Sequence, residues 1–402
     1  MKKTKFITFF IPVLIVMFLI FGVILFPQNS IEAGKKGLDI WVNILIPSLL
    51  PFIIGANLVV SLKIVDIIGF IINPITQLIF NVSGKGSLVF VISMISGYPV
   101  GAKLASELRN ENQISQFEAQ RLIAFCSTSG PLFIIGSVAV GMFKDSSLGY
   151  LMLVCHYLGA ISVGLLFRNY GKETLQKTKS NLGTCVRTVI NSKNENNEGF
   201  FVLFGNAVFS GVNTLLLIGG FVIIFSVVFE ILSLFKVISL MSSILYIPLS
   251  FIGVSKELCQ AFISGLFEMT IGCANISLVN SSSEVLKVSL SSFLVAFSGL
   301  SILAQCCTFI AKTDLSTNLY IFSKLLHGLF AGFFTFILYP LSTSTALVSN
   351  FSNIYDTFYG NSLWVSYVNN YKTILPLIVV FYLISALYTL NNSKSKKIAR
   401  KV

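Results

Sequence analysis

The sequence predicts an all-α polytopic membrane protein with two inverted-topology repeats and broken or re-entrant helices. The composition, the succession of apolar runs and an approximate internal repeat support this prediction. The 402 residues are 54% hydrophobic and 11% charged, with a mean hydropathy of +0.84, whereas soluble domains carry about 25% charged residues. So many apolar side chains must face lipid, which excludes a water-soluble enzyme.

The charges indicate partners. The net charge of +12 reflects 28 Lys and Arg against 16 Asp and Glu. In a soluble protein this surplus would suggest nucleic acid, but in a membrane protein the positive-inside rule explains it. We therefore expect the lipid bilayer as a partner and no nucleic acid. The seven cysteines show no metal-binding spacing, and neither a cofactor nor a metal is expected.

The chain begins with an uninterrupted apolar run behind three lysines, residues 6–26. Its length suits a membrane-spanning helix of about 20 residues. The Phe26-Pro27-Gln28-Asn29 exit offers no small-residue cleavage site of the kind that ends a signal peptide. Residues 1–37 are therefore predicted to be an N-terminal transmembrane helix and its connector.

Residues 38–167 are predicted to be the first membrane repeat. Pro47 and Pro51 interrupt its first apolar run and predict a kinked span. Two later runs contain clusters of glycine, proline and hydroxyl residues. These clusters are Gly97-Tyr98-Pro99-Val100-Gly101-Ala102-Lys103 and Ser127-Thr128-Ser129-Gly130-Pro131. Each cluster indicates a half-helix that ends in an irregular loop.

The remaining segments complete the predicted organisation. Residues 168–199 are polar and basic and form a cytoplasmic linker. Residues 200–341 form the second repeat, with breaks at 265–272 and 298–305. Residues 342–371 lack Lys and Arg and should be an extracytoplasmic loop. Residues 372–402 form a C-terminal transmembrane helix and a basic tail.

An internal repeat accounts for the two halves. Ile95-Ser96-Gly97 recurs as Ile263-Ser264-Gly265, and Ala124-Phe125 recurs as Ala296-Phe297 at nearly the same separation. Basic segments place both termini and the linker in the cytoplasm, so each half crosses the membrane an odd number of times. The halves then have opposite orientations. Many secondary transporters share this arrangement, and their broken helices meet near the midplane to form the substrate site.

The breaks therefore predict a cavity, because irregular backbone at membrane depth is tolerated where protein or a water-filled cavity satisfies its polar groups. A helix starting near Pro131 would direct free N–H groups at an anion. Lys103 either pairs with such an anion or marks the membrane edge, and Tyr98 either stacks on a planar ring or belongs to the interfacial belt. The candidate substrate-binding residues are Gly97, Tyr98, Pro99, Gly101, Lys103, Ser127, Ser129, Pro131, Ser298 and Gln305.

Three further residues have alternative roles. Glu268 is an ionisable group inside an apolar segment, which makes it the candidate for binding a coupling proton or cation. Alternatively, its carboxyl group bonds the neighbouring break. His156 and His327 each stand alone in apolar surroundings and are expected to be packed residues. The sequence contains no Walker, HExxH, GxSxG or triad-like pattern, so no enzyme activity is expected.

The motifs resemble a known family. Ser96-Gly97-Tyr98-Pro99-Val100-Gly101-Ala102-Lys103 is followed by Glu118-Ala119-Gln120-Arg121-Leu122 and Ser129-Gly130-Pro131. In this order the chain resembles the YlbJ-type sporulation integral membrane proteins, which carry nucleoside-recognition Gate domains. The resemblance implies a role late in sporulation, moving dipicolinate out of the mother cell across the outer forespore membrane. Gate domains are also similar to parts of concentrative nucleoside transporters.

Residues and resemblance together predict a transporter of a small anionic substrate, with dipicolinate as the leading candidate. We expect it in the cell membrane or the outer forespore membrane, with both termini cytoplasmic. An ion-coupled nucleoside-type transporter would depend more on Glu268 and Gln305 than on Lys103. A non-transport sporulation scaffold would make its contacts through 342–371. Homo-oligomerisation and other sporulation membrane proteins as partners are left open.

Overall fold

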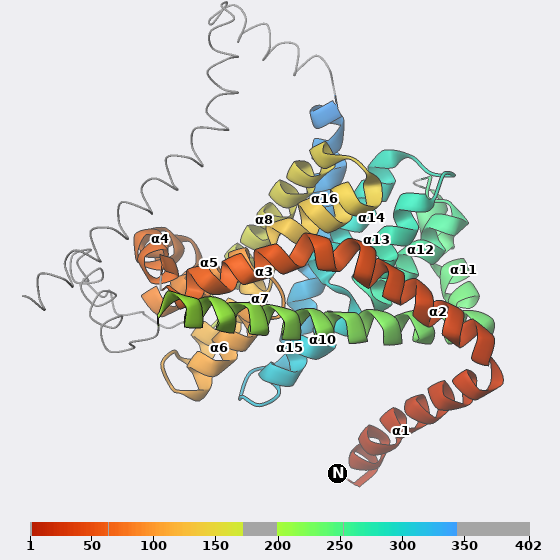
Figure 1. The fold of residues 1–402 in the computed structure, drawn as a ribbon, viewed down its shortest axis with the longest axis horizontal. Coiled ribbons are helices and arrows are strands. Elements are labelled where there is room, and N and C mark those ends of the chain that lie inside the picture. Colours follow the sequence, from red (N-terminus) through yellow and green to blue (C-terminus); the bar gives the residue numbers. More distant parts are fainter. Residues whose placement is uncertain (1, 63, 172–198, 252, 344–402) are drawn as a thin grey trace, which may run out of the picture. The chain divides into compact units, whose positions relative to one another are not determined.

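The computed structural model describes residues 2–62, 64–171, 199–251 and 253–343 (Figure 1). Within these ranges every regular element is a helix, which confirms the all-α class. Five described helices are long and apolar enough to cross a membrane, or six if the bent pair Ile71–Phe80 and Gly84–Ser96 counts as one span. The predicted linker, extracytoplasmic loop and C-terminal helix fall mostly or wholly outside the described residues.

Two long apolar rods lie side by side in Figure 1. One consists of α2 (Pro27–Ile40), the π-helical segment η1 (Trp41–Leu45) and α3 (Ile46–Ser61), and it follows α1 (Lys2–Leu25). The other is α10 (Phe200–Leu234). The Trp41 indole Nε1 donates to the Leu215 carbonyl across 2.9 Å. The π-helical segment η1 lies just before Pro47, and α3 continues through Pro51; the kink at these prolines stays a prediction.

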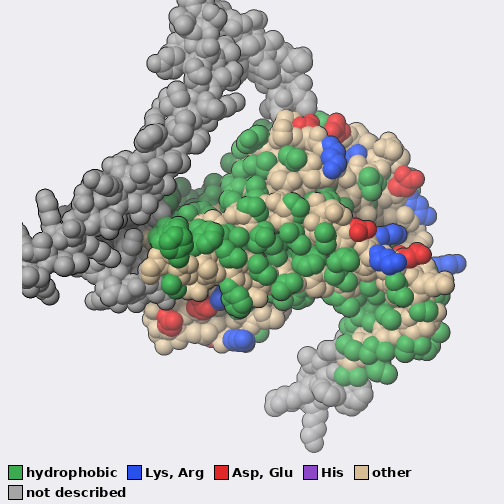
Figure 2. All heavy atoms as spheres, viewed as in Figure 1, with side chains coloured by type: hydrophobic (Ala, Val, Ile, Leu, Met, Phe, Trp, Pro, Cys, Tyr) green, Lys and Arg blue, Asp and Glu red, His purple; other side chains and the backbone are tan. Residues whose placement is uncertain are grey.

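The rods present an apolar outer surface. Figure 2 shows hydrophobic side chains over α3 and α10, whereas charged side chains gather over α2 and near the ends of the molecule. Phe201 and Phe209 on α10 are 85% and 71% exposed. A continuous apolar face of this kind suits lipid, because soluble monomers rarely expose such a patch.

The first half contains both of its predicted breaks. Residues 97–99 separate α5 from α6, and residues 127–130 separate α7 from a helix that begins at Pro131 and continues as η2. Ser83 and Ser115 cap α5 and α7 with their hydroxyl groups, in keeping with the preference for serine at helix N-termini. The helices of this half are α4 (Ile64–Phe80), α5 (Gly84–Ser96), α6 (Val100–Asn110), α7 (Gln116–Cys126), η2 (Phe133–Phe143) and α8 (Ser146–Phe167).

The second half repeats this order. Glu268 separates α12 from α13, and Ser298 separates α14 from α15. Glu268 follows Gly97 by the same number of residues as Ser298 follows Ser127. The duplication and the inverted orientation of the two halves both stay predictions. The helices are α11 (Val237–Ser250), α12 (Lys256–Phe267), α13 (Met269–Leu278), α14 (Glu284–Phe297), α15 (Gly299–Ile310) and α16 (Thr317–Thr343).

In each half the backbone of one break packs against the other. Gly97 has φ +76°, and a Cβ there would lie 2.6 Å from the Gly130 nitrogen. Gly299 has φ +69°, and its Cβ would lie 3.0 Å from the Met269 nitrogen. Only glycine combines positive φ with so close an approach. The glycines therefore hold the paired breaks together.

The first prediction tests this contact. Gly97 has φ 76° and ψ −163°, a region that is essentially restricted to glycine and costs other residues about 1–3 kcal/mol. We expect Gly97→Ala to lower the thermal midpoint of the detergent-solubilised protein by several degrees. Gly130→Ala is the matched control, because a Cβ there has its nearest neighbour at 3.5 Å. Equal destabilisation by both variants would contradict the proposed contact.

Candidate functional site

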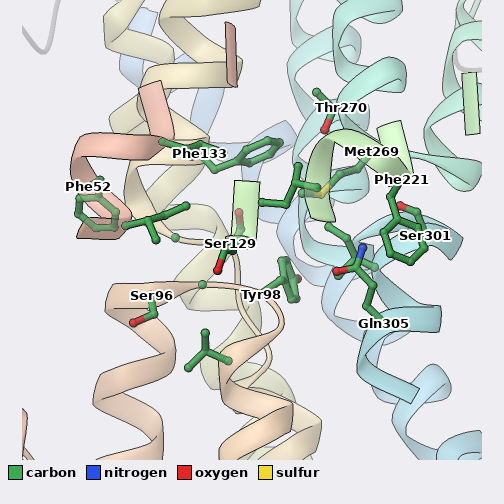
Figure 3. A pocket seen from close by; sticks show the side chains of 18 of the residues that line it. Phe52, Ser96, Tyr98, Ser129, Phe133, Phe221, Met269, Thr270, Ser301 and Gln305 are labelled. Atoms are coloured by element: carbon green, nitrogen blue, oxygen red, sulfur yellow. The ribbon is translucent and has the colours of Figure 1, made fainter. Parts of the chain in front are cut away.

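A cavity of about 100 Å³ lies among the breaks of both halves, with α3 and α10 along its other side. Figure 3 shows Tyr98 and Ser129 from the first half near Met269, Ser301 and Gln305 from the second. Aromatic rings also contribute to the wall, namely Phe52, Phe133 and Phe221. The cavity is large enough for ordered water, which needs at least about 10–15 Å³.

The predicted site residues divide into two groups. Those that line the cavity are Gly97, Tyr98, Ser129, Gln305 and the coupling candidate Glu268. Those outside its wall are Pro99, Gly101, Lys103, Ser127, Pro131 and Ser298. The roles of both groups in binding stay predictions.

The second group has structural positions around the breaks. Gly101 packs closely against the Cys126 carbonyl, and Ser298 has the left-handed backbone conformation between α14 and α15. The Lys103 side chain is half exposed and its Nζ lies 3.8 Å from Glu107 Oε1, one turn further along α6. This position matches the membrane-edge alternative for Lys103 better than a place beside the cavity.

Glu268 caps a half-helix. Its Oε2 accepts a hydrogen bond from the Ile271 amide at 2.8 Å, and its Oε1 accepts one from the Thr270 hydroxyl at 3.1 Å. The residue is 3% exposed. These contacts match the alternative in which the carboxyl group bonds the neighbouring break, whereas its role in coupling stays a prediction.

The other half-helices at the cavity begin without a side-chain cap. They are α6, the helix that begins at Pro131 and continues as η2, and α15. Val100, Phe133 and Ser301 from their first turns line the cavity. The first N–H groups of a helix lack intrahelical partners, and each N-terminus carries about +0.5 charge. Three positive helix ends thus meet at the cavity wall. The N-terminus of the fourth half-helix, α13, is capped by Glu268.

Behind Tyr98 lies a buried lysine. Lys324 on α16 has no exposed surface. Its Nζ donates to the Tyr98 hydroxyl at 2.6 Å and to the Ser127 carbonyl at 2.7 Å, and it lies 3.1 Å from His327 Nδ1. Lys324 is not among the residues predicted from the sequence, although an ionisable group within an apolar span was available as a signal.

The two histidines belong to the same network. His327 Nε2 lies 2.9 Å from the His156 carbonyl oxygen, and the Ser129 amide donates to His156 Nε2 at 3.0 Å. The ring centroids are 4.6 Å apart. Both residues are buried, as expected for packed residues, but they are neighbours rather than isolated. Their contacts fix the break that contains Ser129.

Tyr98 joins the two halves. Its hydroxyl accepts from Lys324 and donates to the Ala296 and Val295 carbonyls at 3.1 and 3.3 Å, near the end of α14. Its ring lines the cavity. An interfacial tyrosine would instead lie at the membrane surface, so its position favours the alternative in which Tyr98 contacts substrate.

Fold and cavity together define a multi-pass integral membrane protein built on paired broken helices. The chain is 34% identical over 395 residues to "Sporulation integral membrane protein YlbJ" of Bacillus subtilis (strain 168), and 94% of this chain and 96% of the relative are covered. The chain therefore belongs to the family of YlbJ sporulation integral membrane proteins, as its motifs predict. No protein-family model matches the chain, and no solved structure matches it.

The second prediction concerns Glu268. We expect Glu268→Ala to destabilise the protein by about 1 kcal/mol, because loss of an N-cap acceptor typically costs about 0.5–2 kcal/mol. Glu268→Gln keeps an acceptor oxygen for the Ile271 amide and should lose less. Thermal unfolding in detergent measures both variants. An alanine variant as stable as the wild type would argue against the capping role.

Proposed function

We propose that this protein is a sporulation-associated membrane transporter of a small anionic substrate, with dipicolinate as the leading candidate. It would move this substrate from the mother cell across the outer forespore membrane during spore maturation. The observation that carries the proposal is the meeting of three half-helix N-termini without a side-chain cap at one cavity, namely those of α6, of the helix that begins at Pro131 and continues as η2, and of α15.

The chemistry of the wall suits a planar aromatic dianion. Helix N-termini attract carboxylates through free N–H groups and a positive dipole end. Ser129, Ser301 and Gln305 add polar groups. The rings of Phe52, Tyr98, Phe133 and Phe221 provide flat apolar surfaces for an aromatic ring. A substrate with separated carboxylates could contact more than one helix end.

The architecture suits transport. Paired broken helices in successive halves are the elements from which many secondary transporters build a site that opens alternately to either side. The relative's printed name links that protein to sporulation, and the family resemblance adds dipicolinate as substrate. The distribution of basic residues supports cytoplasmic termini.

A nucleoside-type substrate is the second candidate, favoured by one observation. Glu268 and Gln305 both line the cavity, and a neutral ring with several hydrogen-bonding groups could use them together with the aromatic wall. A carboxylate at the wall also opposes an anion, although both Glu268 oxygens already accept hydrogen bonds from the start of α13.

The third prediction distinguishes the substrates. We expect purified protein in proteoliposomes to take up labelled dipicolinate faster than protein-free liposomes do. Excess unlabelled dipicolinate should suppress uptake, whereas uridine should not. Stronger suppression by uridine would favour the nucleoside-type transporter.

The fourth prediction tests the anion site. Ser129→Asp places a carboxylate at the cavity wall, and two like charges on the order of 8 Å apart repel by about 2 kcal/mol at an effective dielectric constant of about 20. We expect uptake of dipicolinate to fall roughly tenfold or more. Ser129→Asn, of equal size and neutral, is the matched control and should retain more uptake. Equal uptake by the two variants would contradict an anion site at Ser129.

A spore assay extends this test to the cell. Spores of a strain producing Ser129→Asp should contain less dipicolinate, with the protein still present in the membrane. The transport proposal is wrong if the Ser129→Asp spores contain normal dipicolinate and the wild-type protein takes up dipicolinate no faster than protein-free liposomes do. The scaffold alternative would then remain.

A further inference from the structure

Lys324 lies where two half-helices end, one from each half of the protein. Its Nζ donates directly to the carbonyl of Ser127, the residue that follows α7. Through the Tyr98 hydroxyl it also reaches Ala296, in the last turn of α14. The last four carbonyls of a helix lack intrahelical partners, and each C-terminus carries about −0.5 charge. Two helix C-termini together therefore balance about one positive charge.

Within the described parts of the chain, no ion pair joins Lys324 to a carboxylate. The ion pairs found there are Lys103 with Glu107 and Arg109 with Asp314. The acceptors around the Lys324 Nζ are a hydroxyl, a carbonyl and an imidazole. A buried charge is costly unless it is paired and hydrogen-bonded, and here the helix C-termini serve as the partners.

The hydrogen bonds also assign the protons of the two histidines. His156 Nε2 accepts from the Ser129 amide, so the ring carries its proton on Nδ1 and is neutral. His327 Nε2 donates to the His156 carbonyl. With Lys324 as an ammonium, its Nζ donates to His327 Nδ1, so this ring is neutral too and the one positive charge of the network lies on Lys324.

Other titratable groups face this network from every neighbouring element. Tyr98 comes from the break between α5 and α6, and His156 comes from α8. Cys306 on α15 and Tyr320 on α16 contact the Ser127 hydroxyl. None of these groups is a carboxylate, so none can take over the positive charge by pairing.

We propose that Lys324 is the coupling group of the transporter, a tethered cation in the position where broken-helix transporters gather a mobile cation at half-helix C-termini. Gain and loss of its proton, rather than binding of sodium, then accompanies movement of substrate. The inference rests on the proposed transport function, and it assigns coupling to Lys324 rather than to Glu268.

The proton step follows from the contacts of Tyr98. When the breaks part, one N–H bond of Lys324 breaks and the proton passes to water in the cavity. The free amine then accepts a hydrogen bond from the Tyr98 hydroxyl, which can no longer donate to Ala296. Deprotonation thus removes a contact between the first half and α14. Reprotonation from water on the other side restores it.

The experiment compares net uptake with exchange. Net uptake of labelled dipicolinate is measured in proteoliposomes that contain the purified full-length protein. A pH gradient is imposed, and sodium or choline is the bulk cation. Exchange of labelled for unlabelled dipicolinate is measured without a gradient. The variant is Lys324→Gln. Lys287→Gln is the matched control, because the Lys287 Nζ also donates to a helix C-terminal carbonyl, that of Ser277 on α13.

We expect wild-type uptake to rise at least fivefold with the pH gradient and to be equal in sodium and choline. Lys324→Gln should retain exchange and lose this rise, whereas Lys287→Gln should behave as the wild type. Sodium-dependent wild-type uptake, or a Lys324→Gln protein that still responds to the pH gradient, would overturn the inference. So would loss of exchange in a monodisperse Lys324→Gln protein, which would assign the lysine to the scaffold.

A second measurement needs no substrate. Wild-type protein should have the same thermal midpoint in sodium chloride and choline chloride. Lys324→Ala, which vacates the place of the ammonium group, should gain several degrees in sodium chloride, and Lys287→Ala should not. If sodium chloride raises the thermal midpoint of neither Lys324→Ala nor Lys324→Gln relative to choline chloride, the proposed cation site is wrong. If the wild type moves no dipicolinate, the proposed function fails, while this measurement still tests Lys324.

Discussion

The structure depends on one constraint, namely that every free backbone polar group inside a bilayer needs a partner within the protein or a wet cavity. Each of the four breaks creates such groups. Glu268 caps α13, His156 accepts the Ser129 amide, and Lys324 donates to the Ser127 carbonyl. These buried polar residues would be costly in an unbroken bundle. In this protein they supply the hydrogen-bond partners that the free backbone groups at the breaks need.

The two ends of the half-helices are treated differently. The N-terminal ends of α6, of the helix that continues as η2, and of α15 carry no side-chain cap and lie at the cavity, whereas the C-terminal ends of α7 and α14 are bonded by Lys324 and Tyr98. Three positive helix ends therefore reach the cavity wall without a lysine that lines it, and the buried Lys324 lies behind the wall. Under the proposed function, such a division would separate attraction of an anion from neutralisation of the opposite helix ends.

Local sequence predicted the breaks well, because glycine, proline and serine clusters interrupt apolar runs directly. It could not predict which polar residues meet. His156 and His327 looked isolated because their contact joins α8 to α16, and hydropathy does not tell which face of a helix a residue occupies. For the same reason Lys103, beside a break in sequence, lies outside the cavity wall, while Lys324, far from any break in sequence, bonds one. The spacing of Lys324 and His327 on one helix face was the available signal.

The contact between Gly97 and Gly130 has a consequence for solvation. The atoms nearest to Gly97 and Gly130 across the contact are main-chain atoms, so the contact between the two glycines itself interlocks no side chains. Water entering the gap can hydrate the exposed amides and carbonyls at once. Parting this contact therefore exposes peptide groups, which water can solvate, rather than apolar surface.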